Sequence, residues 1–191
     1  GEWVIRQACA AAATWPNDTR VSVNLSPVQF KNPGLVQVVV SALAASGLAA
    51  HRLELEITES ALLQDSDATL ATLYSLREIG VRIAMDDFGT GYSSLGYLQS
   101  FPFDRIKIAR SFIGDIPEGI GSLNIVRAVA ALGRGLGMQT TAEGVETNDQ
   151  LASVRAEGCT EVQGYLFGKP QPGKEIAALL ASAVEAKASA A

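Results

Sequence analysis

The feature that most constrains the fold is an alternation of six short hydrophobic, β-branched runs with longer amphipathic stretches. The runs predict strands at residues 21–25, 53–58, 81–85, 105–109, 139–142 and 161–167. The stretches predict helices at residues 2–15, 33–48, 67–79, 121–136, 148–157 and 174–185. Strands that alternate with helices in this way favour a parallel sheet covered by helices. The rhythm by itself is compatible with an open doubly wound sheet and with a closed barrel.

A polar residue stands late in each expected strand or directly after it. These six residues are Asn24, Glu56, Asp86, Lys107, Glu143 and Gln163. Neighbours in the series are separated by about one βα unit. In a closed barrel the carboxyl ends of the strands converge on one mouth, whereas an open sheet spreads them along an edge. We therefore expect an α/β fold, a TIM-like (β/α)8 barrel that is incomplete here, with about six strands and the first two strands missing.

Length and composition indicate one domain over residues 1–191, with a frayed tail at 187–191. Hydrophobic residues make up 48% of the chain, and the net charge is −5. This acidic balance argues against a polymeric nucleic acid as partner, but not against a small nucleotide. Cys9 and Cys159 are too few for a disulfide framework, and no run has the length of a membrane span. We expect a cytoplasmic location, with any membrane anchor in other regions of a parent protein.

Acidic side chains dominate the expected barrel mouth. They are Glu56, Asp86, Asp87 and Glu143. Clustered carboxylates repel one another, and hard divalent cations such as Mg²⁺ or Mn²⁺ compensate their charge. Two such ions can hold a phosphodiester, activate a water and stabilise the leaving oxygen. Asn24 adds a carbonyl oxygen, and Lys107 directs a positive charge toward the water or the phosphate. A single acid here is typical of a helix cap or a surface, but four at strand ends favour a site for two metal ions.

Other chemistries lack the residues that they need. His51 is the only histidine and lies in a loop, where a surface or capping role is expected. The two cysteines have no zinc-ligand spacing, and the chain has no G-x-S-x-G motif of a serine hydrolase. Gly89 and Gly91 follow the paired aspartates and permit a tight, mobile loop over the mouth. The Gln163 amide can bond a phosphate or a base edge, and a purely structural amide is the open alternative.

Six segments resemble the EAL domain in sequence, order and spacing. They are SVNLS at 22–26, ELEITES at 54–60, DDFGTGYSSL at 86–95, KIARSF at 107–112, AEGVET at 142–147 and QGY at 163–165. The resemblance covers nearly the whole chain, as the C-terminal three quarters of such a domain. It implies a TIM-like barrel that hydrolyses the bacterial messenger cyclic di-GMP to linear pGpG with Mg²⁺ or Mn²⁺.

The resemblance also implies a role for each matching residue. The implied ligands of the first metal ion are Asn24, Glu56 and Asp86. Those implied for the second ion and the water are Asp86, Asp87 and Glu143. The implied catalytic residues are Glu143 as general base, Asp87, and Lys107 at the water or phosphate, with Gln163 beside the substrate. Glu59 would brace the loop that contains Phe88, Gly89, Thr90 and Gly91, and Glu146 would be a support residue.

Two departures from the family pattern bear on activity. The Glu-Ala-Leu segment, with its metal-binding glutamate and a nearby substrate-binding arginine, is absent, and Glu2 is no substitute because it begins a helix. Ala109 stands where the family has an aspartate. The first departure leads us to expect weak or no catalysis from this chain alone. The second leaves a degenerate domain open.

Three functions therefore remain from the sequence. The first is a metal-dependent cyclic di-GMP phosphodiesterase in the intact parent protein. The second is an inactive receptor that binds cyclic di-GMP and signals to a partner, and the third is an interaction domain that has lost the ligand. The resemblance further implies a possible homodimer and an upstream sensory or GGDEF domain.

Overall fold

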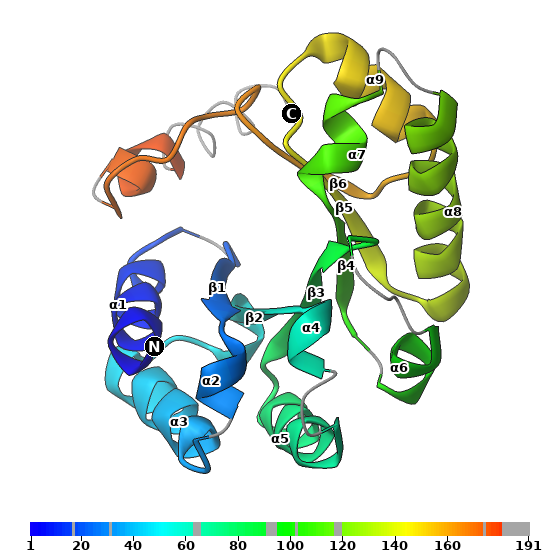
Figure 1. The fold of residues 1–191 in the computed structure, drawn as a ribbon. Helices are drawn as coiled ribbons and strands as arrows, with labels where there is room; N and C mark the ends of the chain where they lie inside the picture. Colours follow the sequence, from blue (N-terminus) through cyan, green and yellow to red (C-terminus); the bar gives the residue numbers. More distant parts are fainter. Residues whose placement is uncertain are drawn as a thin grey trace. The chain divides into compact units, whose positions relative to one another are not determined.

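The computed structural model describes residues 1–16, 18–30, 32–62, 66–90, 95–101, 103–116, 120–173 and 175–180 (Figure 1). Its strands are β1 (Val21–Leu25), β2 (Leu53–Thr58), β3 (Arg82–Phe88), β4 (Arg105–Ile108), β5 (Gln139–Glu143) and β6 (Glu161–Gln163). They form one sheet in the order β1-β2-β3-β4-β5-β6. The pairs β3–β4, β4–β5 and β5–β6 are parallel. A doubly wound sheet reverses its strand order at a switch point, and this sheet does not, so the predicted class, an incomplete TIM-like barrel, is confirmed.

Helices connect the strands and begin or end close to the predicted positions. The longer ones are α1 (Glu2–Ala13), α3 (Leu35–Ser46), α5 (Ser66–Glu78), α8 (Ile120–Leu136) and α9 (Asn148–Ala156). Residues 175–180 are helical within the predicted range 174–185. The rest of that range beyond residue 180 and the expected tail at 187–191 lie outside the described residues. None of the described helices combines the length and apolar composition needed to cross a bilayer.

The structure corrects several predicted boundaries. The strand predicted at 81–85 begins at Arg82 and continues through both aspartates to Phe88. The strand predicted at 161–167 ends at Gln163, after which the chain turns and the Leu166 N–H donates to the Val145 carbonyl at 3.1 Å. Five short helical elements were not predicted, because they are too short to show a periodicity. They are α2 (Pro27–Phe30), η1 (Ala50–Arg52), α4 (Glu59–Leu62), α6 (Leu95–Ser100) and α7 (Arg110–Gly114).

The described chain divides into two compact units. The first contains the described residues of 1–55, 71–82 and 170–180, and the second contains those of 56–70 and 83–169. In the first unit α1 packs against α3, and Cys9 is fully buried between apolar side chains. The Arg52 guanidinium donates to the carbonyls of Thr19 at 2.9 Å and Ala12 at 2.8 Å. These bonds connect the start of β2 to the segment that follows α1.

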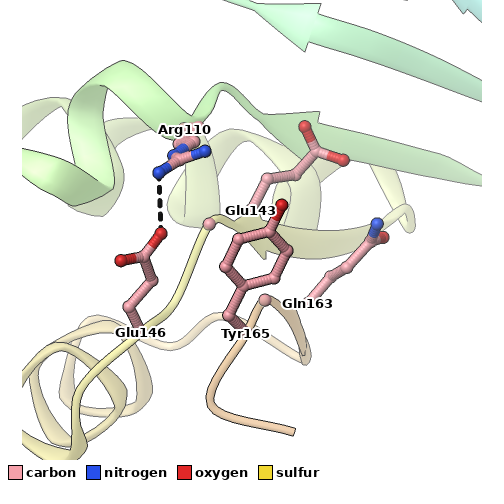
Figure 2. Close-up of a pocket in the computed structure, with 7 residues that line it drawn as sticks. Arg110, Glu143, Glu146, Gln163 and Tyr165 are labelled. Carbon is pink, nitrogen blue, oxygen red and sulfur yellow. Dashed lines mark hydrogen bonds and ion pairs between the residues drawn. The ribbon is translucent and has the colours of Figure 1, made fainter. Parts of the chain in front are cut away.

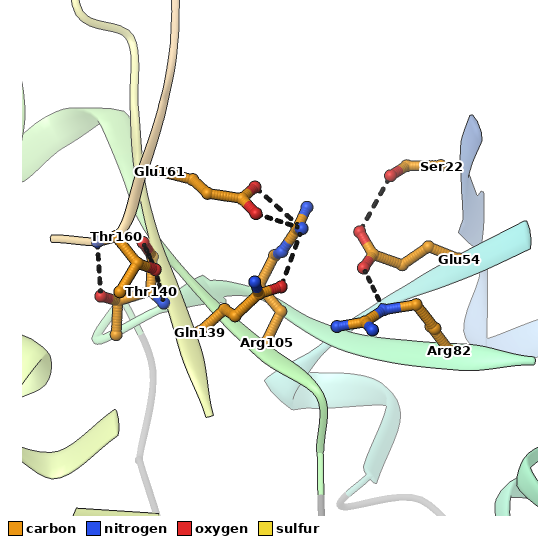
Figure 3. Close-up of polar contacts among 8 residues, drawn as sticks. All are labelled: Ser22, Glu54, Arg82, Arg105, Gln139, Thr140, Thr160 and Glu161. Carbon is orange, nitrogen blue, oxygen red and sulfur yellow. Dashed lines mark hydrogen bonds and ion pairs between the residues drawn. The ribbon is translucent and has the colours of Figure 1, made fainter. Parts of the chain in front are cut away.

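Buried polar contacts stabilise the amino ends of the strands in each unit (Figure 3). In the first unit Glu54 is fully buried, and its Oε1 accepts a hydrogen bond from Ser22 Oγ at 3.0 Å. Arg82 Nε lies 3.6 Å from the other oxygen of the same carboxylate. In the second unit the Arg105 guanidinium contacts Glu161 at 2.8 Å and the Gln139 side-chain oxygen at 3.3 Å. Arg82 therefore pairs with Glu54 of the neighbouring strand β2, and Arg105 of β4 pairs with Glu161 of β6, on the far side of β5.

Candidate active site

Lys107 lies at the centre of a buried cluster of carboxylates in the second unit. Its side chain projects from β4 and is 3% exposed as a residue. The ammonium nitrogen lies 2.7 Å from Glu56 Oε2, 3.0 Å from Asp86 Oδ1 and 2.7 Å from Glu143 Oε1. These acids come from the late positions of β2, β3 and β5. Four consecutive strands thus bring the predicted lysine and three of the predicted acids together.

The pKa shifts in this cluster follow from burial and charge. Burial by itself lowers the pKa of Lys107, but attraction to Glu56 and Glu143 and the hydrogen bonds that it donates to both outweigh burial and raise the pKa. Lys107 is therefore a permanent cation at neutral pH. Burial raises the pKa of Glu143, and the charges of Asp86 and Glu56 add to this, while Lys107 opposes it. Three acids that share one ammonium leave an excess of negative charge.

An irregularity in β3 turns two consecutive aspartates toward the same site. Consecutive residues of a regular strand point to opposite faces. The register between β3 and β4 shifts between Met85 and Phe88, and Asp87 adopts φ 52°, a left-handed conformation that is unusual for a non-glycine residue. Carboxylate oxygens of Asp86, Asp87 and Glu143 consequently lie within 4.8 Å of one another. The bulge thus assembles a set of oxygen donors that a regular strand would separate.

This donor set fits a hard divalent cation. Asp86 Oδ1 is buried and accepts no hydrogen bond from the described residues, although the Lys107 ammonium lies 3.0 Å away. A buried carboxylate oxygen in this condition is stabilised by a cation. Carboxylate oxygens are the ligands that Mg²⁺ and Mn²⁺ prefer. Asp86, Asp87 and Glu143 are therefore the residues of the described chain that can hold a metal ion together.

No described contact joins the other predicted site residues to this cluster. Asn24 lies in β1, which belongs to the first unit, and its role as a metal ligand stays a prediction. His51 lies in η1, exposed, with its Nε2 3.6 Å from Asp18. Glu59 begins α4 and is buried, and its predicted support of the loop is not tested by a described contact. Gly91 lies outside the described residues.

The described part of the loop after β3 packs against α7. Phe88 is buried, whereas Thr90 is exposed and its Oγ1 donates to the Asp87 carbonyl at 2.9 Å. Gly89 has φ 94°, and a Cβ at this position would lie 2.9 Å from the Phe112 ring. Glycine is therefore required here both by the backbone conformation and by the close approach of a ring.

A pocket adjoins the cluster at the carboxyl ends of β5 and β6 (Figure 2). Its volume is about 190 Å³, and it is lined by Arg110, Glu143, Gly144, Glu146, Gln163, Gly164 and Tyr165. Arg110 forms an ion pair with Glu146 at 2.7 Å, and its guanidinium carbon lies 5.9 Å from the centre of the Tyr165 ring. The pocket therefore places predicted residues beside two that the sequence analysis missed, Arg110 and Tyr165. Their positions directly after the ends of β4 and β6 were the available signal.

Ala109 links β4 to α7, at the position where the resemblance described above implies an aspartate. It is buried and is the N-cap residue of α7, with φ −56° and ψ 142° and no side-chain cap. Aspartate is a favoured N-cap residue because its carboxylate accepts from the free N–H groups of the first turn. Alanine at this position therefore removes a cap as well as a carboxylate close to Lys107 in sequence.

Comparisons of the sequence with known proteins point to one family. A family model described as EAL domain matches residues 1–170. The uncharacterized protein y4lL of Sinorhizobium fredii is 57% identical over 188 residues, which is 98% of this chain and 23% of that protein. MucR of Pseudomonas aeruginosa, described as a bifunctional diguanylate cyclase/cyclic di-GMP phosphodiesterase, is 43% identical over 185 residues, which is 95% of this chain and 27% of that protein. The chain thus spans about a quarter of the length of these two relatives.

Solved structures agree with the sequence comparisons. The structure of PaMucR phosphodiesterase in a c-di-GMP complex matches with a TM-score of 0.88 and 43% identity, covering 92% of this chain and 73% of that chain. A structure of Klebsiella pneumoniae BlrP1 with manganese and c-di-GMP matches with a TM-score of 0.82 and 32% identity, covering 88% of this chain and 44% of that chain. BlrP1 is also known in a complex with calcium and c-di-GMP.

Proposed function

This chain belongs to the EAL domain family, and we propose that within its intact parent protein it hydrolyses cyclic di-GMP to linear pGpG in a metal-dependent reaction. The observation that carries the proposal is the convergence of Lys107 with carboxylates from β2, β3 and β5, beside a pocket at the carboxyl ends of the strands. Catalytic residues of TIM-like barrels lie at this end of the strands. The similarity to MucR, described as having cyclic di-GMP phosphodiesterase activity, gives independent support.

The metal ions in this proposal are Mg²⁺ or Mn²⁺, two per site. Asp86, Asp87 and Glu143 would hold one of them, and Asn24 and Glu56 would complete the site of the other with Asp86. Bound divalent ions lower the pKa of a coordinated water and neutralise charge on a phosphodiester. The oxygen-only donor set and the excess of negative charge around Lys107 support this assignment.

The side chains of the cluster would accept the proton of the attacking water and supply a positive charge to the water or the phosphate. Burial raises the pKa of Glu143, which makes its carboxylate a stronger proton acceptor than an ordinary glutamate and suits a general base for the attacking water. Lys107 keeps its charge and forms ion pairs with three carboxylates, so its ammonium offers a fixed positive charge to the water or the phosphate. Asp87, exposed at the bulge, can reach a ligand from solvent, and the Gln163 amide lines the pocket beside it.

Chromatography of cyclic di-GMP after incubation with the intact parent protein and Mn²⁺ tests this function. We expect pGpG to appear, and we expect Glu143→Gln to abolish it. Glu157→Gln is the matched control, because Glu157 pairs with Arg127 away from the pocket and its loss should leave the rate unchanged. Intact cyclic di-GMP after long incubation with folded protein would contradict the proposed hydrolysis.

A receptor for cyclic di-GMP is the second candidate, and Ala109 favours it. With alanine at position 109, the chain has no carboxylate two residues after Lys107, and α7 has no side-chain cap at its first turn. A receptor would bind cyclic di-GMP with a divalent ion and leave it intact. In that case Ala109→Asp should raise turnover, whereas an active enzyme would show pGpG without this substitution. Failure to bind cyclic di-GMP at all would leave the interaction domain as the remaining function.

The setting of the domain is also a proposal. The chain matches about a quarter of relatives such as MucR, a bifunctional cyclase and phosphodiesterase, which supports a parent protein with an upstream sensory or GGDEF domain. We further propose a homodimer, a cytoplasmic site of action and no polymeric nucleic acid as partner. The acidic net charge of −5 supports the last point.

A further inference from the structure

The pocket beside the carboxylate cluster contains a cation that the proposed reaction has not used. Arg110 is the cationic member of the described residues that line this pocket, and it begins α7, with Ala109 between it and β4. Lys169 lies 5.8 Å from the centre of the Tyr165 ring but does not line the pocket. Lys107 is surrounded by three carboxylates within 3.0 Å. By contrast Arg110 has one ion-pair partner, Glu146, at 2.7 Å. An anion that enters the pocket therefore meets Arg110 as the more available positive charge.

The Arg110–Glu146 ion pair is exposed enough for Arg110 to leave Glu146 and bind another anion. The two side chains are 66% and 41% exposed, and such exposed pairs contribute little to stability, so replacing Glu146 by another anion costs little. A guanidinium binds a phosphate through two parallel hydrogen bonds, which a single carboxylate contact does not match. A phosphate is therefore a stronger partner for Arg110 than the one that it has.

The surroundings of Arg110 hold its guanidinium at the pocket. Its carbon lies 5.9 Å from the centre of the Tyr165 ring, a distance at which a cation is attracted by the ring. Figure 2 shows the Arg110–Glu146 pair on one side, with the Tyr165 ring between this pair and the side chains of Glu143 and Gln163. Gly144 has φ 72°, and a Cβ there would collide with the Arg110 side chain. The glycine thus leaves the space in which the stem of Arg110 lies.

We propose that Arg110 binds one phosphate of the guanine dinucleotide by leaving Glu146, while Tyr165 keeps the guanidinium at the pocket. This inference rests on the proposed function, because the substrate is taken from it. The pocket volume of about 190 Å³ is too small for a whole dinucleotide, so the pocket receives a phosphate and its adjoining ribose. Glu146 is then a competitor that holds Arg110 in place while the site is empty of nucleotide.

The chain provides a matched control for this pair. Arg127 and Glu157 form an ion pair at 2.6 Å, and Arg127 is 59% exposed, close to the exposure of Arg110. This second pair connects α8 to α9 and does not line the pocket. Arg127→Gln therefore removes the same charge and the same kind of contact as Arg110→Gln, but away from the proposed phosphate.

The test is the affinity of the full 191-residue chain for cyclic di-GMP, measured by titration calorimetry with Ca²⁺ in place of Mn²⁺ to suppress turnover. We expect Arg110→Gln to weaken binding about tenfold or more, since a charge-assisted contact to phosphate is lost. The affinity of Arg110→Lys should lie between those of the unaltered chain and Arg110→Gln, because lysine retains the charge but cannot form two parallel hydrogen bonds to a phosphate. Arg127→Gln should bind within twofold of the unaltered chain. Glu146→Gln should bind more tightly, because Arg110 loses its competitor.

Two results would overturn the inference. One is binding by Arg110→Gln equal to that of Arg127→Gln. The other is an equal loss for Arg110→Gln and Glu146→Gln, which would make the pair a structural unit rather than an exchangeable one. If the unaltered chain does not bind cyclic di-GMP, the proposed function fails first, and this outcome is distinct from both results above. If Arg110→Gln does not fold, the other two variants still test the inference. Arg110→Lys should bind cyclic di-GMP more weakly than the unaltered chain, and Glu146→Gln should bind it more tightly.

Discussion

Arg105 and Lys107 are separated by one residue on β4 and project to the same face, yet their surroundings differ. Arg105 lies at the amino end of the strand and contacts the carboxylate of Glu161 and the neutral amide of Gln139. Lys107 lies at the carboxyl end and contacts three carboxylates. The charge at the amino end is balanced by the protein itself. The charge at the carboxyl end is not.

This difference indicates which end of the strands stabilises the fold and which end binds ligands. A balanced pair such as Arg105–Glu161 needs no ion from solution, and its role is to stabilise the arrangement of the strands, here β4 and β6 on either side of β5. An unbalanced cluster has a negative excess that an added cation can neutralise, which raises its affinity for divalent ions. In TIM-like barrels the amino ends of the strands serve stability and the carboxyl ends serve catalysis. In β4, the stabilising Arg105 and the candidate catalytic Lys107 lie within one strand of four residues.

The largest effect is expected for Lys107→Met. This variant leaves three buried carboxylates without a cation, and removing one partner from a buried ion pair costs about 3–5 kcal/mol. We expect the free energy of unfolding in EDTA to fall by this order. Mn²⁺ should restore a substantial part, because a divalent ion supplies the missing charge. Urea unfolding in EDTA and in Mn²⁺ measures both values, and an identical loss in the two buffers would contradict an unbalanced cluster.

Arg105→Met should destabilise the protein less, by about 2 kcal/mol, because its partner Glu161 is 31% exposed and water can solvate it. Mn²⁺ should restore none of this loss, since the pair at the amino end needs no further cation. The same urea titrations measure it. Recovery of Arg105→Met by Mn²⁺ would erase the distinction between the two ends of β4.

The sequence predicted the strands and the side chains that meet at their carboxyl ends, but not the local geometry of the site. Six hydrophobic runs and the polar residue that ends each one were enough for the strand order and for the convergence of Glu56, Asp86, Lys107 and Glu143. Alternation along a strand is a local property, and it is visible in one sequence. The roles of these residues, as opposed to their places, stay predictions.

Features that depend on long-range geometry were beyond the sequence. The left-handed conformation of Asp87 and the bulge beside it have no glycine or proline to mark them, because tertiary contacts impose them on an ordinary Asp-Asp-Phe segment. The pairing of Arg110 with Glu146 joins residues 36 positions apart. A local pattern carries no information about such a contact.

A third effect concerns the pH dependence of stability without metal. Burial raises the pKa of Glu143 above its ordinary value of 4.5, so above pH 4.5 the folded state retains a proton that the unfolded state has lost. Stability therefore falls as pH rises from 4.5 through the raised pKa, by at most about 1.4 kcal/mol per pH unit for one proton. Unfolding curves in EDTA should show this fall in the unaltered chain relative to Glu143→Gln. Parallel pH profiles of the two proteins would indicate that the cluster does not penalise the ionised acid.

The smallest effect is expected for Thr160→Val at the amino end. Thr160 Oγ1 accepts from the Thr140 N–H at 2.8 Å and donates to the Thr140 carbonyl at 2.9 Å. Valine has nearly the same shape and neither bond, so the free energy of unfolding should fall by about 1 kcal/mol. Calorimetric affinities for Mn²⁺ and for cyclic di-GMP should not change, because both ligands are assigned to the opposite ends of the strands. Two residues of β6 separate Thr160 from Gln163 in the pocket. A change in either affinity would therefore show that the amino end helps to position the site, and that the division between the two ends is incomplete.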